Sequence, residues 1–416
     1  MNYFLIFIIF ILINLINIFD STDIYVLMIM GTTNFIVSTI TLYKNRNSPF
    51  GGPLFLFISY ILYSILIGRY INPDDFPINK IIDYNYDATA QLLILIFMAI
   101  LMLNNFKNSI LILRPNNINS NIINIISISM ALLGFLLTLL FTDKGSEGEY
   151  GYSPLYEYSI IFFIFSLYYA KFANRITASL VLFLAILVIA RDFGMGHRAT
   201  GLQIALLIYI TNFYSFYSFK RLLLVFLPSI FLSHIITIYR INYSLNIEMV
   251  ISEIMDSFSR NFFASDTSVY AYVASLTFIS VHELMSFSEL INDSVNFIIS
   301  QFSYSYYGES LYSISKLYYQ HSNGGILPIY LYYYFGLFSI IIPGPLVAYY
   351  LKLGSRPMQE YSFFVFAYIF ATFPRWLLYA PTQLMRGVFL LSICSFILFI
   401  YKRFMVTILI PNVNLN

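Results

Sequence analysis

The chain has few charged residues. Only 10% of its 416 residues are Asp, Glu, Lys or Arg, and 59% are hydrophobic. A soluble domain carries about 25% charged residues, so this composition excludes an ordinary soluble protein. The mean hydropathy of +0.76 is typical of a chain that lies largely in a bilayer. With no long polar stretch, residues 1–416 are predicted to form a single integral membrane domain.

Other scarce residue types exclude further classes. The single cysteine, Cys394, cannot form an intramolecular disulfide, and no cysteine–histidine cluster is available for zinc. We therefore expect no metal site and no cofactor. No loop concentrates basic residues enough to bind a phosphate backbone, so we expect no nucleic-acid partner. The apolar residues 1–19 lack a basic n-region and a cleavage site, which favours a first membrane span over a signal peptide.

Long apolar runs are abundant, and they predict an all-α polytopic membrane protein with about twelve transmembrane helices. Asn14, Asn17 and Asn34 lie inside the first two runs, and we expect their amides to face other helices, because lipid offers no hydrogen-bond partner. The predicted spans cover residues 3–19, 24–43, 53–71, 88–105, 122–142, 156–171, 176–191, 202–219, 222–239, 326–351, 361–380 and 387–402.

Basic residues are distributed asymmetrically between the connectors of these spans. Five short connectors and the C-terminal tail, all predicted to lie on one side, carry 12 of the 22 basic residues, accompanied by Glu360 as the single acid. Basic residues are retained on the cytoplasmic side of inserted helices, so both termini are predicted to be cytoplasmic. The pairs are Lys44/Arg46, Lys107/Arg114, Lys171/Arg175, Lys220/Arg221, Lys352/Arg356 and Lys402/Arg403.

Residues 240–325, between the ninth and tenth spans, form the longest connector and lie on the outer side in this topology. Two helical patterns occur within it, and they predict either amphipathic helices lying on the membrane or a small subdomain packed on itself. Tyrosines between residues 304 and 334 fit either an aromatic belt at the interface or a surface for sugar rings. The two patterns are Ile247, Val250, Ile251, Ile254, Met255 and Phe258, then Val281, Leu284, Phe287, Ile291, Val295 and Ile298.

The segment from Arg191 to Gly201 places Arg191, His197 and Arg198 between the seventh and eighth spans, on the side where positive charge is disfavoured. A guanidinium matches a pair of phosphate oxygens and stays charged at any relevant pH. We interpret this segment as functional, because charge that violates the topology bias is usually retained for use. The alternative is structural: Arg191 snorkels and Asp192 pairs with Arg198.

A second polar segment, His321 to Gly325, lies where the long loop re-enters the membrane. The pKa of an unperturbed histidine is near neutrality, so His321 can exchange a proton with a hydroxyl group. Further outer-side cations point to a polyanionic ligand, such as a pyrophosphate, although each alone could simply pair with lipid headgroups. These cations are Arg240, Arg260, Arg375 and Arg386.

These two segments resemble motifs of the O-antigen polymerase and ligase superfamily. Arg191 to Leu207 is similar to the Gly-x-Arg-x-x-x-Leu-Leu start of a helix in that superfamily. His321 to Gly336 resembles the His-Asn-x-x-(x)-Leu…Gly segment that ends its large periplasmic loop, although Ser322 separates His321 from Asn323 here. The Gly324-Gly325…Tyr334-Phe335-Gly336 run and the Asn-, Ile-, Tyr- and Phe-rich composition look like the polymerase branch.

The resemblance implies glycosyl transfer on the periplasmic face of a bacterial inner membrane. The growing glycan would leave undecaprenyl pyrophosphate and join the non-reducing end of a new lipid-linked repeat unit. It also implies that lipid-linked oligosaccharides and membrane lipid are partners, and it allows a chain-length regulator protein.

The resemblance also distributes roles among the candidate residues. Arg198 would stabilise the leaving pyrophosphate, and His321, or else Glu309, would be the general base. The residues expected to contact pyrophosphate or glycan are Arg191, His197, Arg240, Arg260, Arg375, Arg386 and Asn323.

Two alternatives stay open. A ligase that moves the glycan to lipid A–core would differ only in its acceptor. A lipid-linked oligosaccharide flippase would be expected to have short outer loops and charges in the middle of its spans, which this chain does not match.

Overall fold

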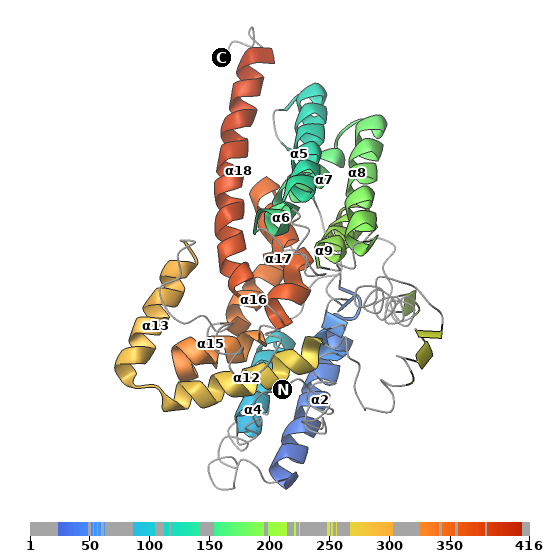
Figure 1. Cartoon of the computed structure of the whole chain (residues 1–416). Coiled ribbons are helices and arrows are strands. Elements are labelled where there is room, and N and C mark those ends of the chain that lie inside the picture. The colour runs from blue at the N-terminus through green and yellow to red at the C-terminus, as the bar shows by residue number, and fades with distance from the viewer. Residues whose placement is uncertain are drawn as a thin grey trace. The chain divides into compact units, whose positions relative to one another are not determined.

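The computed structural model describes most of the helical segments (Figure 1). It describes residues 24–48, 86–104, 112–115, 118–141, 154–194, 199–213, 267–302, 325–340, 343–353, 357–378 and 381–409, with isolated positions between 51 and 62 and between 220 and 255. The chain divides into two compact units. Unit 1 comprises residues 1–106, 247–352 and 373–385, and unit 2 comprises residues 107–246, 353–372 and 386–416.

Helices make up nearly all of the described structure, as predicted. Among the described residues, the one β interaction is an isolated bridge between Ile112 and Met358. The elements are α2 (Ile24–Asn45), α4 (Asp87–Met102), α5 (Ser120–Leu140), α6 (Pro154–Tyr158), α7 (Ile160–Ala170), α8 (Arg175–Gly194), α9 (Ala199–Ile208), the π-helix η4 (Tyr209–Phe213), α12 (Thr267–Leu284), α13 (Phe287–Ser300), α15 (Leu327–Phe335), the 3₁₀-helix η6 (Gly336–Ile340), α16 (Pro343–Leu353), α17 (Glu360–Leu378) and α18 (Thr382–Leu409).

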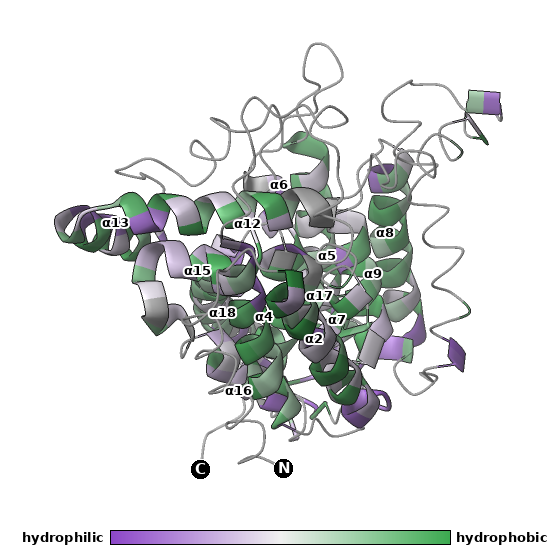
Figure 2. Ribbon diagram, turned by 90° about the horizontal axis from the view of Figure 1, so that it is seen from below, coloured by the Kyte–Doolittle hydropathy of each residue, from purple (hydrophilic) through white to green (hydrophobic). Residues whose placement is uncertain are grey.

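Four of these helices are long and apolar enough to cross a membrane: α2, α5, α8 and residues 382–405 of α18. These helices expose large apolar side chains; in α8, for example, Ile176 is 82% exposed. Figure 2 shows most of the α8 ribbon in the hydrophobic colour. Large exposed apolar side chains of this kind suit contact with lipid hydrocarbon. The apolar helices therefore fit a membrane protein, whereas twelve spans and the orientation of the termini stay predictions.

In unit 1, α2 packs along α4 (Figure 1). Polar side chains of α2 donate hydrogen bonds to carbonyl groups of α4. Asn34 Nδ2 donates to the carbonyl of Gln91 at 3.0 Å, and Lys44 Nζ donates to the carbonyl of Met102 at 2.8 Å. The Asn34 side chain is fully buried. The prediction that Asn34 faces a neighbouring helix is therefore confirmed.

In unit 2, α7 packs against α5, α8 and α9. The hydroxyl groups of Ser127 on α5 and Ser166 on α7 each donate to the other residue's carbonyl, at 3.0 and 2.8 Å. Gly134 allows α5 to approach α7 closely, because a Cβ there would lie 2.9 Å from Cε2 of Phe163. Small residues at helix contacts are typical of membrane bundles.

The predicted span 326–351 is wrong as a single helix. Its residues form α15, η6 and α16, and Gly336 ends α15 at φ +51°. Glycine adopts this backbone conformation without the steric penalty of a Cβ. Tyr332, Tyr333 and Tyr334 are buried, at 6%, 1% and 2% exposure, so these three form neither an interfacial belt nor an open surface for sugars.

The second helical pattern of the long loop is divided in two. Ser286 begins α13 with a capping box, in which its hydroxyl and the Glu289 carboxylate bond each other's backbone N–H groups. Within α13, the predicted apolar row is exposed at Phe287, Ile291, Val295 and Ile298. Phe297, on a different side of the same helix, is 2% exposed. The helix α13 is therefore amphipathic and also packs on α15. The first pattern, residues 247–258, lies mostly outside the described residues.

Candidate functional site

The junction between α8 and α9 in unit 2 is organised around the buried carboxylate of Asp192. Its side chain is 1% exposed and accepts hydrogen bonds from the Tyr156 hydroxyl and from the backbone N–H of Gly201, the latter at 2.6 Å. Gly201 lies in the first turn of α9, where backbone N–H groups lack partners within the helix. Asp192 therefore caps α9 from α8, with Tyr156 of α6 as its second donor.

Gly201 permits this contact because it has no side chain. A Cβ at this position would lie 3.0 Å from Oδ2 of Asp192 and 3.2 Å from Cε1 of Phe193. A glycine is therefore needed at position 201, because the carboxylate of Asp192 approaches the backbone there too closely for a side chain.

Arg191 also anchors this junction. Its guanidinium donates to the carbonyl of Thr138, in the last turn of α5. The last carbonyls of a helix lack partners within the helix and carry the negative end of its dipole, so a cation is favourable there. Arg191 thus joins α8 to α5, while Asp192 joins α8 to α9 and α6.

These contacts hold both ends of a short segment. Residues 193–200 lie between Asp192 and the N–H group of Gly201 that it binds. Four of them, residues 195–198, lie outside the described residues, and these include His197 and Arg198. The alternative pairing of Asp192 with Arg198 therefore stays untested, and the described partners of Asp192 are Tyr156 and Gly201.

In unit 1, a second polar cluster surrounds α15. The hydroxyl of Tyr332 donates to Oε1 of Glu283 at 2.7 Å, and that of Tyr333 donates to Oδ2 of Asp293 at 2.9 Å. Nδ1 of His282 lies 2.8 Å from the carbonyl oxygen of Tyr333. The loop helices α12 and α13 thus supply an imidazole and two carboxylates to a tyrosine-rich helix.

The start of α15 is packed against α12. The backbone N–H of Ile326 donates to Oγ of Ser275 at 3.1 Å. A Cβ on Gly325 would lie 2.5 Å from Cε2 of Phe278, so a larger residue does not fit there. The backbone that follows His321 and Asn323 is therefore held in place, although those two residues lie outside the described part of the chain.

A second buried carboxylate, Asp87, lies at the start of α4 and is 2% exposed. It accepts hydrogen bonds from the Tyr272 hydroxyl of α12 and from Nε2 of Gln91, the latter at 3.2 Å. The sequence interpretation missed Asp87, His282, Glu283 and Asp293. Their partners lie up to 185 residues away, so no local spacing could have identified them.

Three of the ten predicted site residues lie within the described residues. Arg191 has the position given above, and Arg375 of α17 and Arg386 of α18 are half-buried, the first in unit 1 and the second in unit 2. The other seven lie outside: His197, Arg198, Arg240, Arg260, Glu309, His321 and Asn323. Across the described residues, no group of three or more His, Cys, Asp or Glu side chains could hold a metal ion.

Comparisons of the chain with protein-family models, with curated proteins and with solved structures find no match.

Proposed function

We propose that this chain is a membrane glycosyltransferase of the O-antigen polymerase type. It would transfer a growing glycan from undecaprenyl pyrophosphate to the non-reducing end of a lipid-linked repeat unit. The proposal places the chain in a bacterial inner membrane with both termini in the cytoplasm, as the charge bias of the connectors predicts. Its substrates are lipid-linked oligosaccharides, and a chain-length regulator is the protein partner that it allows.

The observation that carries the proposal is the anchoring of the α8–α9 junction. Buried hydrogen bonds at Asp192 and a helix-terminal contact at Arg191 hold the two ends of the segment that contains His197 and Arg198. Groups that stabilise developing charge are effective when they are fixed before the reaction, because no reorganisation is then needed. An arginine on such a segment is suited to a pyrophosphate leaving group.

The chemistry assigns separate roles to the two motifs. The bond between the anomeric carbon of the donor glycan and the pyrophosphate oxygen breaks, and the acceptor hydroxyl oxygen bonds to that carbon. The hydroxyl proton passes to a general base, for which His321 is the first candidate and Glu309 the second. The negative charge that develops on the pyrophosphate is stabilised by Arg198 and Arg191, supported by Arg240, Arg260, Arg375 and Arg386.

An in-frame deletion in the source bacterium tests the proposal, with the lipopolysaccharide banding pattern as the readout. We expect lipid A–core that bears a single repeat unit, because export and ligation continue while chain growth stops. Bare core with polymer retained on the prenyl carrier would identify the ligase instead. Bare core without periplasmic polymer would identify the flippase, and an unchanged ladder would refute all three.

A further inference from the structure

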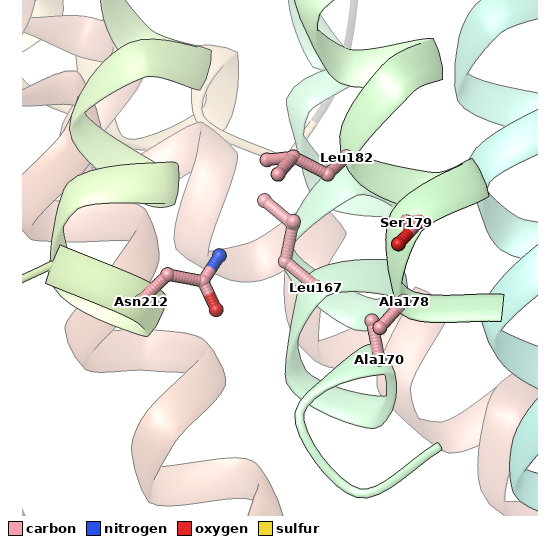
Figure 3. A pocket seen from close by; sticks show the side chains of 6 residues that line it. All are labelled: Leu167, Ala170, Ala178, Ser179, Leu182 and Asn212. Carbon is pink, nitrogen blue, oxygen red and sulfur yellow. The ribbon is translucent and has the colours of Figure 1, made fainter. Parts of the chain in front are cut away.

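A small pocket lies in unit 2, where the ends of α7 and η4 meet the start of α8 (Figure 3). The side chains of Leu167 and Leu182 and the amide of Asn212 point toward one another across it. Its volume of about 150 Å³ is well below the roughly 300–1,000 Å³ of sites that enclose a small molecule. Its size and lining suit a section of a hydrocarbon chain. The lining residues are Leu167, Ala170, Ala178, Ser179, Leu182 and Asn212.

Two basic residues adjoin the lining residues along the chain. Lys171 directly follows the lining residue Ala170, and its Nζ donates to the carbonyl of Thr211 at 3.4 Å, next to Asn212. An ammonium group has three donors, and this bond uses one. Arg175 is exposed and lies one turn before Ala178 and Ser179, so its side chain is on the helix face that lines the pocket.

The polarity of α8 adds to this positive charge. Arg175 is the first residue of α8, Asn174 caps the helix by accepting from the N–H of Thr177 at 2.8 Å, and the first turn contains no acid. The N-terminal end of a helix is the positive end of its dipole, where anions are favourable and cations are not. The placement of Arg175 therefore strengthens a positive potential at the start of α8, next to a pocket whose lining is mainly apolar, and this arrangement suits an anion with a hydrocarbon tail.

We infer that this pocket and its two cations bind an anionic glycerophospholipid. The section of one acyl chain nearest the glycerol fills the pocket, and the phosphate contacts Lys171 and Arg175. The charge bias of the connectors assigns this end of α8 to the cytoplasmic leaflet. The inference is independent of the proposed glycosyl transfer, because it uses no residue of the α8–α9 junction.

Lipid retention by the purified, delipidated protein tests the inference. Dioleoyl phosphatidylglycerol or dioleoyl phosphatidylcholine is added in detergent, and bound lipid is counted by native mass spectrometry. We expect preferential retention of phosphatidylglycerol, weakened about fivefold by Lys171→Gln and again by Arg175→Gln, since each removes one cation near a headgroup. Arg175→Lys should retain most of the affinity.

Two matched controls separate the site from general effects of charge and volume. Ala178→Leu fills the pocket and should abolish the preference, whereas Ala190→Leu, at an exposed position of α8 about two turns beyond the lining residue Leu182, should leave it intact. Arg46→Gln removes a cation of a different connector, in unit 1, and should change nothing. Size-exclusion profiles select folded variants before lipid is counted.

Equal retention of the two lipids by the wild-type protein would refute the inference. So would retention that is unchanged by both Lys171→Gln and Arg175→Gln in folded protein. Displacement of phosphatidylglycerol by an equimolar amount of undecaprenyl phosphate would assign the pocket to the carrier lipid and overturn the choice of a phospholipid.

Discussion

Replacing Asp192 tests whether its hydrogen bonds stabilise the α8–α9 junction at the proposed site. Asp192→Ala leaves the Tyr156 hydroxyl and the N–H of Gly201 without the carboxylate that accepts from both. A buried donor that loses its acceptor costs about 1–3 kcal/mol, so the two together should destabilise the protein by about 2–6 kcal/mol. Asp192→Asn keeps one carbonyl acceptor and should cost about half as much. Tyr156→Phe removes one donor and should cost about 1–3 kcal/mol.

The loss of stability is measured by heating the purified protein in detergent and recording the fraction that stays monodisperse. At about 2 °C for each kcal/mol in a large chain, Asp192→Ala should lower the midpoint by roughly 4–12 °C. The double variant Ser127→Ala/Ser166→Ala is the matched control, because it removes two hydrogen bonds in the same unit and leaves no donor unpaired. We expect a shift of no more than about 3 °C for this control.

The same variants are then tested for polymer formation in cells at a temperature at which they stay folded. Asp192→Asn should shorten or abolish the polymer ladder at wild-type protein levels, while the serine control should leave it normal. A midpoint for Asp192→Ala within 1 °C of wild type, by the rough conversion above, would refute the capping role. Normal polymer from a folded Asp192→Asn protein would show that anchoring this segment does not matter for activity.

Four further predictions concern single residues. Arg198→Ala should abolish polymer formation while the protein stays in the membrane, and His321→Ala should impair polymer formation severely. For either variant, a normal chain-length distribution in lipopolysaccharide gels would remove the substituted residue from the site. Gly336→Ala forces a Cβ into φ +51° and should cost about 1–3 kcal/mol, read from the melting midpoint. Hydrogen bonds from the hydroxyl and the backbone N–H of Ser286 lower the pKa of Glu289 in the folded protein. The stabilisation by Glu289 is therefore fully present above the unfolded pKa of about 4.3, and it is lost as the pH falls through the lower folded pKa. The melting midpoint of Glu289→Ala should therefore fall below wild type at pH 7 and converge with it near pH 3; a constant difference would contradict this.

The sequence predicted the helices well where apolar runs were uninterrupted. The runs 24–43, 122–142 and 176–191 appear as α2, α5 and α8, because a run long enough to cross a bilayer must bond its own backbone as a helix. The run 326–351 failed, since hydropathy does not register a change of backbone conformation. Gly336 and Pro343 interrupt it, and the glycine and proline signals were outweighed by the apolar composition.

Of the candidate site, the sequence could identify the residue types and could not identify their partners. Arg191 was expected at a phosphate, and its described contact is the end of α5, because a helix terminus and an anion present the same negative potential to a guanidinium. Asp192 was considered only as a partner for a nearby arginine. Its contacts with Tyr156 and Gly201 depend on how α6, α8 and α9 meet, which local sequence does not encode.

The tyrosines of α15 belong to a polar network that composition alone could not predict. A tyrosine in an apolar run can lie at the membrane interface or pack inside the protein, provided that its hydroxyl finds a partner. Here Tyr332 and Tyr333 bond Glu283 and Asp293, which the sequence had counted simply as acids of the outer loop. Breaking one such pair leaves a polar group without its partner. The acids of α12 and α13 therefore hold α15 to these two helices, and Tyr333→Phe should loosen α13, detectable as faster amide hydrogen exchange in α13 with α5 unchanged.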